Sequence, residues 1–372
     1  MRKIAANLIF PVSSPPIKNA YLVLSDEGEI LDVCGGGETL HEISGLEYYS
    51  GILIPGFVNA HCHLELSHLK GNLAPGKGLP AFLAQVPQLR QAQESDIHRA
   101  IQHALRYMWS RGVNGLGDLV NTQHTLNFKA NSPIKSHSFI ELFSLADQSN
   151  QSVLNKGKVL CDAFKQENLA TSLAPHSFYG TPPELINLIL DELSVPQNLS
   201  IHYKEHPKEK LYDSTEKLRL LLQHPMIKQL LLVHNIYLES AELQGLQNLP
   251  IEEKQKIILT LCPNSNWFIE NKLPPVEMLL KSGFPICLGT DSLASNGQLS
   301  ILEEMKTLLF QFPELSFIDV LSWATLNGAR ALGFDKQLGS FESGKKPGVL
   351  LVEAFDFKKQ TLTAESTVTR LV

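Results

Sequence analysis

Short apolar segments recur along most of the chain, and each is followed by a polar residue and then by a stretch with helical periodicity. Strands that alternate with helices predict a parallel sheet, because a parallel connection needs a crossover of about a dozen residues or more. Eight such repeats predict an α/β protein with a closed (β/α)8 TIM barrel. The eight predicted strands lie near residues 52–63, 113–120, 136–143, 169–176, 199–205, 229–235, 256–262 and 284–291.

The segments between these strands have the apolar spacing of helices. Two of them begin with a capping-box pattern, which places Thr181 and Ser300 at predicted N-caps with Glu184 and Glu303 three residues later. The helical region at 302–331 is long, and we expect it to contain more than one helix.

The two ends of the chain differ from the middle. Residues 1–54 are rich in short strand signals and turns, and the tail from Gly344 onwards is again strand-like. Neither end is long enough to form a stable sheet alone. We therefore predict one small β-sandwich built from residues 1–54 and 337–372, beside a barrel at residues 55–336. The alternative is that the two ends extend the edges of the barrel separately.

Composition narrows the class of protein. The chain is 43% hydrophobic and 19% charged with a net charge of -6, and it has no basic run interleaved with aromatic residues, so neither nucleic acid nor an anionic membrane is an expected partner. No window approaches the roughly 18 consecutive apolar residues of a membrane span. The five cysteines are dispersed without a CxxC pair, which argues against a disulfide framework or a cysteine zinc cluster. We expect a soluble, cytoplasmic protein with a small-molecule substrate.

Residues that carry chemistry gather where the predicted strands end. His61 and His63 close the first strand, and because residues i and i+2 face the same side, both imidazoles can reach one metal ion while Cys62 faces away. The active groups of such barrels lie at these carboxyl ends. The strand ends carry His61, His63, Asp118, Glu141, His176, His202, His234, Asn264 and Asp291. Histidine nitrogens with one carboxylate suit a zinc-class ion that keeps a position for water. The predicted metal ligands are His61, His63, His202 and Asp291.

Three further residues have predicted roles near these ends. Glu205 lies three positions after His202 and would face away from it in an unbroken strand, so the strand must end and turn there. A buried glutamate beside an activated water suits proton shuttling, whereas the alternative is a solvated loop residue. His234 ends an apolar strand and is a candidate to orient the attacking water, the alternative being a hydrogen-bonded core histidine. His176 precedes a predicted helix and is expected to contact substrate rather than metal.

Taken together, these stretches resemble the amidohydrolase superfamily, and within it the branch of deaminases with one metal ion. No lysine is placed on the fourth strand to bridge two metals, which favours one ion. The residues that carry the resemblance follow the family's order, at 55–63, 202, 205, 233–235, 262–266 and 289–296. Residues 63–67 and 291–296 are similar to the aminodeoxyfutalosine deaminases of menaquinone biosynthesis, and the branch also includes adenosine-type deaminases and chlorohydrolases.

This resemblance implies one divalent metal ion, zinc before ferrous iron, although both suit the ligand set. It implies that Glu205, His234 and Asp291 act in catalysis and that Glu65, His176 and Ser295 contact the substrate. A homodimer is a family-level expectation, and the roles of Asp118 and Glu141 stay open.

The implied reaction is release of ammonia from a purine-like nucleoside, with 6-amino-6-deoxyfutalosine as the best candidate. The alternatives are another aminopurine or pyrimidine, hydrolysis of a cyclic amide or an aryl chloride at the same metal site, and a barrel without catalysis that serves as a scaffold.

Overall fold

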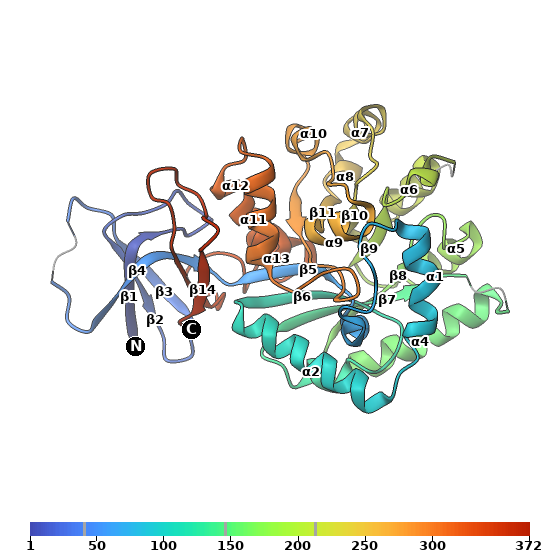
Figure 1. Cartoon of the computed structure of the whole chain (residues 1–372), viewed down its shortest axis with the longest axis horizontal. Coiled ribbons are helices and arrows are strands. Elements are labelled where there is room, and N and C mark those ends of the chain that lie inside the picture. The colour runs from blue at the N-terminus through green and yellow to red at the C-terminus, as the bar shows by residue number, and fades with distance from the viewer. Residues whose placement is uncertain (40–41, 145–146, 212–213) are drawn as a thin grey trace.

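The structure is a computed structural model that describes residues 1–39, 42–144, 147–211 and 214–372. Both chain ends enter one six-stranded sheet with the strand order β14-β13-β4-β1-β2-β3, which lies at one end of the molecule in Figure 1. Its strands are β1 (Arg2–Ile9), β2 (Ala20–Leu24), β3 (Ile30–Gly35), β4 (Leu46–Pro55), β13 (Val349–Glu353) and β14 (Thr367–Arg370). The ends therefore meet as predicted. The second layer that would make this sheet a sandwich is not found in the described part of the chain.

Eight parallel strands make up the body of the molecule, and each falls on a predicted strand. They form two four-stranded sheets with the orders β5-β6-β7-β8 and β12-β11-β10-β9. Single parallel bridges join the two sheets at both seams, from Cys62 to Asp291 and from Ser177 to His202. The predicted α/β class is confirmed. The eight parallel strands form two four-stranded sheets linked by these bridges, and not one continuous hydrogen-bonded sheet. The strands are β5 (Phe57–Cys62), β6 (Val113–Val120), β7 (Lys135–Leu142), β8 (Ala170–Pro175), β9 (Gln197–Tyr203), β10 (Ile227–His234), β11 (Ile257–Leu261) and β12 (Ile286–Leu288).

Helices follow the strands and cover the outside of the sheets (Figure 1). Within the described residues, no helix is both long enough and apolar enough to cross a bilayer. The region predicted to hold more than one helix contains α11, α12 and α13. The helices are α1 (Leu79–Leu89), α2 (Glu94–Ser110), α3 (Leu126–Ala130), α4 (Asn150–Gln166), α5 (Pro183–Asp191), α6 (Ser214–Gln223), α7 (Ser240–Gln247), α8 (Ile251–Lys254), α9 (Pro263–Glu270), α10 (Val276–Lys281), α11 (Ile301–Gln311), α12 (Phe317–Ala324) and α13 (Leu326–Leu332), with 3-10 helices η1 (Leu64–Leu69) and η2 (Pro207–Leu211).

The two capping predictions have different outcomes. Ser300 is the N-cap residue of α11, although its side chain makes no capping hydrogen bond. The prediction for Thr181 is wrong, because α5 begins one residue later with Pro182 as its N-cap. The Thr181 hydroxyl instead donates to the carbonyl oxygen of Leu142 at 3.1 Å, at the end of β7. A buried hydroxyl needs a partner, and this carbonyl supplies it.

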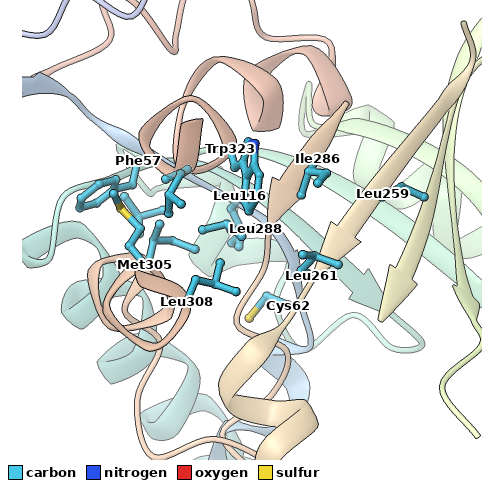
Figure 2. Close-up of a cluster of buried hydrophobic side chains, with 14 of the residues drawn as sticks. Phe57, Cys62, Leu116, Leu259, Leu261, Ile286, Leu288, Met305, Leu308 and Trp323 are labelled. Atoms are coloured by element: carbon cyan, nitrogen blue, oxygen red, sulfur yellow. The ribbon is translucent and has the colours of Figure 1, made fainter. Parts of the chain in front are cut away.

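The main apolar core lies between the strands and the surrounding helices. Figure 2 shows Phe57, Leu288, Met305 and Trp323 packed together between β5, β12 and helices α11 and α12. Burying an apolar side chain of this kind stabilises the fold by about 1.5–3 kcal/mol relative to leaving it exposed. Cys62 faces this same cluster and is fully buried, as predicted. Its two neighbours in the chain therefore face the other side of β5, where the histidine cluster lies.

Candidate active site

Histidines from three strands converge with one carboxylate at the carboxyl ends of the parallel strands. The Nε2 atom of His63 lies 3.3 Å from Nε2 of His202 and 3.6 Å from Oδ1 of Asp291. The Nε2 atom of His61 lies 3.9 Å from the same Asp291 oxygen. His234 joins His61 and His202 in a second group whose nitrogen atoms all lie within 4.8 Å of one another. The four predicted ligand side chains therefore meet at one point.

His61 is the best indication that this cluster holds a metal ion. Its side chain is fully buried, and neither ring nitrogen has a hydrogen-bond partner among the described residues. Burial and the neighbouring His63 hold its pKa well below the ordinary value, so the ring is neutral. A buried polar group without a partner costs about 1–3 kcal/mol, and a neutral imidazole nitrogen is a ligand that zinc-class ions prefer. The donor set fits such an ion.

Asp291 is held by hydroxyl groups on the side away from the histidines. Its backbone is left-handed, with φ of 56°, and its Oδ2 atom accepts hydrogen bonds from Ser265 at 2.6 Å and from Ser295 at 3.1 Å. Burial acts to raise its pKa, but charge interactions with His63 and His234 and the Ser265 hydroxyl lower it below the ordinary value. Ser295 is fully buried, is absent from the cavity lining and contacts this carboxylate. The structure thus gives Ser295 a partner within the protein in place of the predicted substrate contact.

The predicted turn after His202 is present. Strand β9 ends at Tyr203, and Lys204 adopts a left-handed backbone with φ of 53°, which brings Glu205 back toward the site. The Oε2 atom of Glu205 lies 3.6 Å from Nε2 of His234. Its Oε1 atom accepts a hydrogen bond of 2.5 Å from the hydroxyl of Tyr179. Glu205 is 7% exposed, so it is a buried carboxylate and not a solvated loop residue.

The orientation of His234 is set by Asn266. The Nδ1 atom of His234 donates to Oδ1 of Asn266 at 2.8 Å, which leaves Nε2 facing Glu205. The backbone of His234 is left-handed, with φ of 81°, and such a strained conformation is typical of functional positions. His234 is buried and hydrogen-bonded, as in the alternative of a core histidine, but it also lines the cavity.

Glu141 has a role that could not be assigned from the sequence. Its Oε1 atom lies 2.7 Å from Nδ1 of His176 and 3.5 Å from Nδ1 of His202. Burial acts to lower the pKa of His176, but the Glu141 carboxylate raises it to about 9, so this histidine is a cation. His202 donates through Nδ1 to the carbonyl oxygen of His176 at 2.9 Å, which turns its Nε2 atom toward His63.

Two other predicted positions are engaged within the protein. Glu65 lines the cavity, but its carboxylate is bound by Arg90 and accepts hydrogen bonds of 2.7 Å from both the backbone and the hydroxyl of Thr122. Asp118 is fully buried and accepts hydrogen bonds from Leu64 at 2.9 Å and from Lys129 at 2.7 Å. Asp118 therefore supports the chain directly after His63 and does not face the cavity.

Several residues of the site have no role predicted from the sequence. Ser265 and Asn266 lie within residues 262–266, a stretch that carries the family resemblance, but the sequence does not show which side chains they contact. Tyr179 follows His176 by three residues, which is a weak signal at a strand end. Arg90 has no signal in the sequence, because it reaches Glu65 from the end of α1.

The cluster opens into a cavity of about 620 Å³. Polar and titratable groups belong to its lining, and so do apolar side chains of α1, among them Phe82, Leu83 and Val86. Small-molecule sites have volumes of about 300–1,000 Å³ and combine apolar walls with a few convergent polar groups. This arrangement can hold a flat, partly apolar molecule against a metal centre, with Glu205 and His176 at its edge.

Known proteins resemble this chain in sequence and in fold. The model of the amidohydrolase family matches residues 52–369. A 5-methylthioadenosine/S-adenosylhomocysteine deaminase of Halalkalibacterium halodurans is 25% identical over 370 residues, which covers 91% of this chain and 82% of that protein. The structure of Helicobacter pylori aminofutalosine deaminase in complex with methylthio-coformycin has a TM-score of 0.75 at 24% identity and covers 95% of this chain and 92% of that chain. Atrazine chlorohydrolase from Arthrobacter aurescens, complexed with zinc, has a TM-score of 0.76 at 16% identity and covers 96% and 88%.

Proposed function

This chain belongs to the amidohydrolase family and is a hydrolase of carbon–nitrogen bonds, and we propose that it is a metal-dependent deaminase of a purine-like nucleoside. The observation that carries the proposal is the unpaired, neutral His61 beside Asp291, with the buried carboxylate of Glu205 close to His234. We also propose that the parallel strands form a (β/α)8 barrel at 55–336, with a smaller domain from 1–54 and 337–372. A cytoplasmic location and a homodimer stay predictions from the sequence.

The proposed metal ion is zinc, and ferrous iron also suits this ligand set. When bound, such an ion supplies Lewis acidity and lowers the pKa of a coordinated water toward ~7. The proposed ligands are His61, His63, His202 and Asp291. The hydrogen bond from His202 Nδ1 to the carbonyl of His176 and those from Ser265 and Ser295 to Asp291 hold two of these ligands in position.

The side chains around the ligands would carry out the proton transfers. His234, fixed by Asn266, orients the attacking water through Nε2, and Asp291 takes its proton. Glu205 would pass one proton of the water to the ring nitrogen next to the carbon under attack, and Asp291 would hold the other until it reaches the leaving amine. The step balances because the water oxygen bonds to the ring carbon, the carbon–nitrogen bond breaks, the ring nitrogen keeps one water proton, and the amine leaves as ammonia with the other. Tyr179 keeps Oε1 of Glu205 in a fixed direction.

The substrate we propose is 6-amino-6-deoxyfutalosine, which would place the enzyme in menaquinone biosynthesis. The apolar wall of α1 can cover a purine ring, and the His176 cation can bind an acceptor atom of the ligand. The aminofutalosine deaminase structure and the 5-methylthioadenosine/S-adenosylhomocysteine deaminase both support a nucleoside substrate. The second candidate substrate class is therefore methylthioadenosine and S-adenosylhomocysteine.

The test is ammonia release by zinc-loaded protein with 6-amino-6-deoxyfutalosine, methylthioadenosine, S-adenosylhomocysteine and adenosine in parallel. We expect the futalosine compound to be deaminated well above the other three. Glu205→Gln should retain zinc and lose most turnover, because the amide cannot shuttle the proton. A near-normal rate in this variant would remove Glu205 from the mechanism. If none of the four nucleosides is deaminated while zinc is bound, the purine-nucleoside proposal is overturned.

A further inference from the structure

A second group of side chains that could hold a metal ion lies on the outside of the molecule. Glu94 and His98 belong to α2, and His124 lies in the connection between β6 and α3. The ligand atoms of these three side chains all lie within 4.8 Å of one another. None of the three lines the cavity described above. The group is therefore separate from the proposed active site in both its residues and its surface.

Two of the three distances between the ligand atoms of this group are close to those between the ligands of one metal ion. The Nε2 atom of His98 lies 3.4 Å from Nδ1 of His124 and 3.5 Å from Oε1 of Glu94. In a hydrogen bond from an N–H group, the nitrogen and the acceptor atom are usually about 2.7–3.2 Å apart. Both contacts of His98 are longer than this, so neither is a well-formed hydrogen bond. A tetrahedral zinc ion with Zn–N distances of about 2.0–2.1 Å separates its ligand atoms by roughly 3.3–3.4 Å. Both contacts are close to that edge length.

The local structure holds these side chains in place. Glu94 and His98 are four residues apart on one helix and therefore lie on the same face. The His98 ring packs edge-on against Phe128 with ring centroids 5.3 Å apart, and against His124 at 5.4 Å. The backbone N–H of His124 donates to the hydroxyl of Thr122 at 3.2 Å. Both histidines are half-buried, so less side-chain freedom is lost when they bind an ion.

We propose that Glu94, His98 and His124 form a second metal site, for zinc or a divalent ion of similar ligand preference, with water completing the coordination. Two imidazoles and one carboxylate are a donor set that zinc uses in proteins. The side chains present one nitrogen from each ring and one carboxylate oxygen, without the Cys ligands that a cuprous ion would favour. This proposal does not depend on the identity of the substrate.

An ion at this site would act on the wall of the active-site cavity. It would tie α2 to the connection that follows β6, which contains Asn121 and Thr122. Those two residues hold the carboxylate of Glu65, with backbone N–H contacts of 3.3 Å and 2.7 Å, and Asn121 also lines the cavity. Thr122 links the proposed metal site to the cavity wall directly, because its hydroxyl accepts a hydrogen bond from the backbone N–H of His124 and donates one to Glu65. The site is thus placed to stabilise the cavity wall.

The test is a zinc titration of the zinc-loaded protein by calorimetry, with metal content measured before and after. We expect the wild-type protein to bind one further equivalent. His98→Ala and His124→Ala should each weaken this second equivalent by at least about 100-fold, because even the loss of a residue that only supports a ligand costs 10–100-fold. His103→Ala is the matched control, since it removes an exposed histidine of the same helix that lies outside the group, and it should bind as the wild type does.

Two additional measurements separate this site from general surface binding. The second equivalent should raise the thermal unfolding temperature of the wild type and of the His103→Ala variant, and leave that of His98→Ala unchanged. Cobalt added as the second equivalent should give visible absorption that both ligand variants lose. The proposal is overturned if the wild type binds no further equivalent, or if His98→Ala and His124→Ala bind it as tightly as the wild type. Circular dichroism of each variant shows whether it is folded.

Discussion

The carboxylate of Glu209 accepts the backbone N–H of Glu205 at 2.8 Å. The same carboxylate accepts the backbone N–H groups of Lys204 at 2.8 Å and of His206 at 3.1 Å. Three successive amides of the turn after β9 are therefore bound to one side chain, and this turn contains the left-handed Lys204. Glu209 is itself buried, and burial together with the charge of Glu205 raises its pKa to about 7. Glu209 thus fixes the direction in which Glu205 enters the cavity.

Removing this support should slow deamination without removing the metal ion. Glu209→Ala leaves three backbone amides without their acceptor, so Glu205 loses its fixed direction, and a displacement of about 1 Å can lower the rate by about 100-fold. We expect kcat to fall by about 10- to 100-fold with a smaller change in KM and unchanged zinc content. The kcat of Glu209→Gln should lie between those of the wild type and of Glu209→Ala, because the amide oxygen of glutamine still accepts hydrogen bonds.

A double variant distinguishes positioning from general damage to the fold. If Glu209 acts through Glu205, adding Glu209→Ala to Glu205→Gln should cause little further loss of kcat. Fully additive losses in the double variant would contradict this interpretation. A wild-type rate in Glu209→Ala would also contradict it.

The hydroxyl of Tyr179 should contribute directly to turnover. Tyr179→Phe removes its hydrogen bond to Oε1 of Glu205, and a hydrogen bond to a charged group is worth about 1.5–3 kcal/mol, or roughly 10- to 100-fold in rate. Steady-state kinetics with the best substrate measure this loss. Tyr237→Phe is a matched control, because Tyr237 donates in the same way to Glu270 at 2.6 Å, and neither of these residues lines the cavity. Equal losses in the two variants would argue against a role for Tyr179 in catalysis.

Acid should destabilise the fold through His137, which lies in β7 and contacts the hydroxyl of Ser172 at 2.9 Å. Burial lowers the pKa of His137 to about 4, below its ordinary value of 6.5. Between these two values the unfolded chain binds a proton that the folded protein does not, so stability is lost as the pH falls from 6.5 toward 4. Between pH 7 and pH 5 this residue should account for a loss of about 2 kcal/mol in the free energy of unfolding.

Urea unfolding at both pH values tests this prediction. His137→Gln cannot take up the proton, so its free energy of unfolding should decrease less between pH 7 and pH 5 than that of the wild type. His103→Gln removes an exposed histidine and should retain the wild-type decrease. The same decrease in His137→Gln as in the wild type would assign the acid sensitivity to other groups.

Removal of the metal ion should weaken the fold as well as abolish turnover. Zinc that binds only the folded protein stabilises it by about 4 kcal/mol when its free concentration is 1,000 times Kd. We expect chelation to lower the thermal unfolding temperature and to stop ammonia release, and added zinc to restore both. Measurements in the His98→Ala background exclude a contribution from the proposed surface site. In that background, His61→Ala should no longer respond to zinc, and an unchanged response would contradict its assignment as a ligand.

Features that depend on neighbouring positions in the chain can be predicted from the sequence alone. The alternation of apolar strands with helices is local, and all eight strands were located from it. The two-residue period of a strand was enough to place His61 and His63 on one side and Cys62 on the other. The three-residue spacing from His202 to Glu205 required a turn, and the left-handed Lys204 provides it.

The choice of partner side chains depends on how distant segments of the chain pack together. Glu141 binds His176, Ser265 binds Asp291, and Glu65 is held by Arg90 and Thr122. Each of these pairs joins residues from different elements or loops, and their distance depends on the packing of elements that are far apart in the chain. The period of a strand or helix shows the side to which a residue points, but it does not show which hydroxyl, amide or guanidinium group lies opposite. The hydrogen-bonding needs of buried polar groups then select the partners that the packed structure brings within reach.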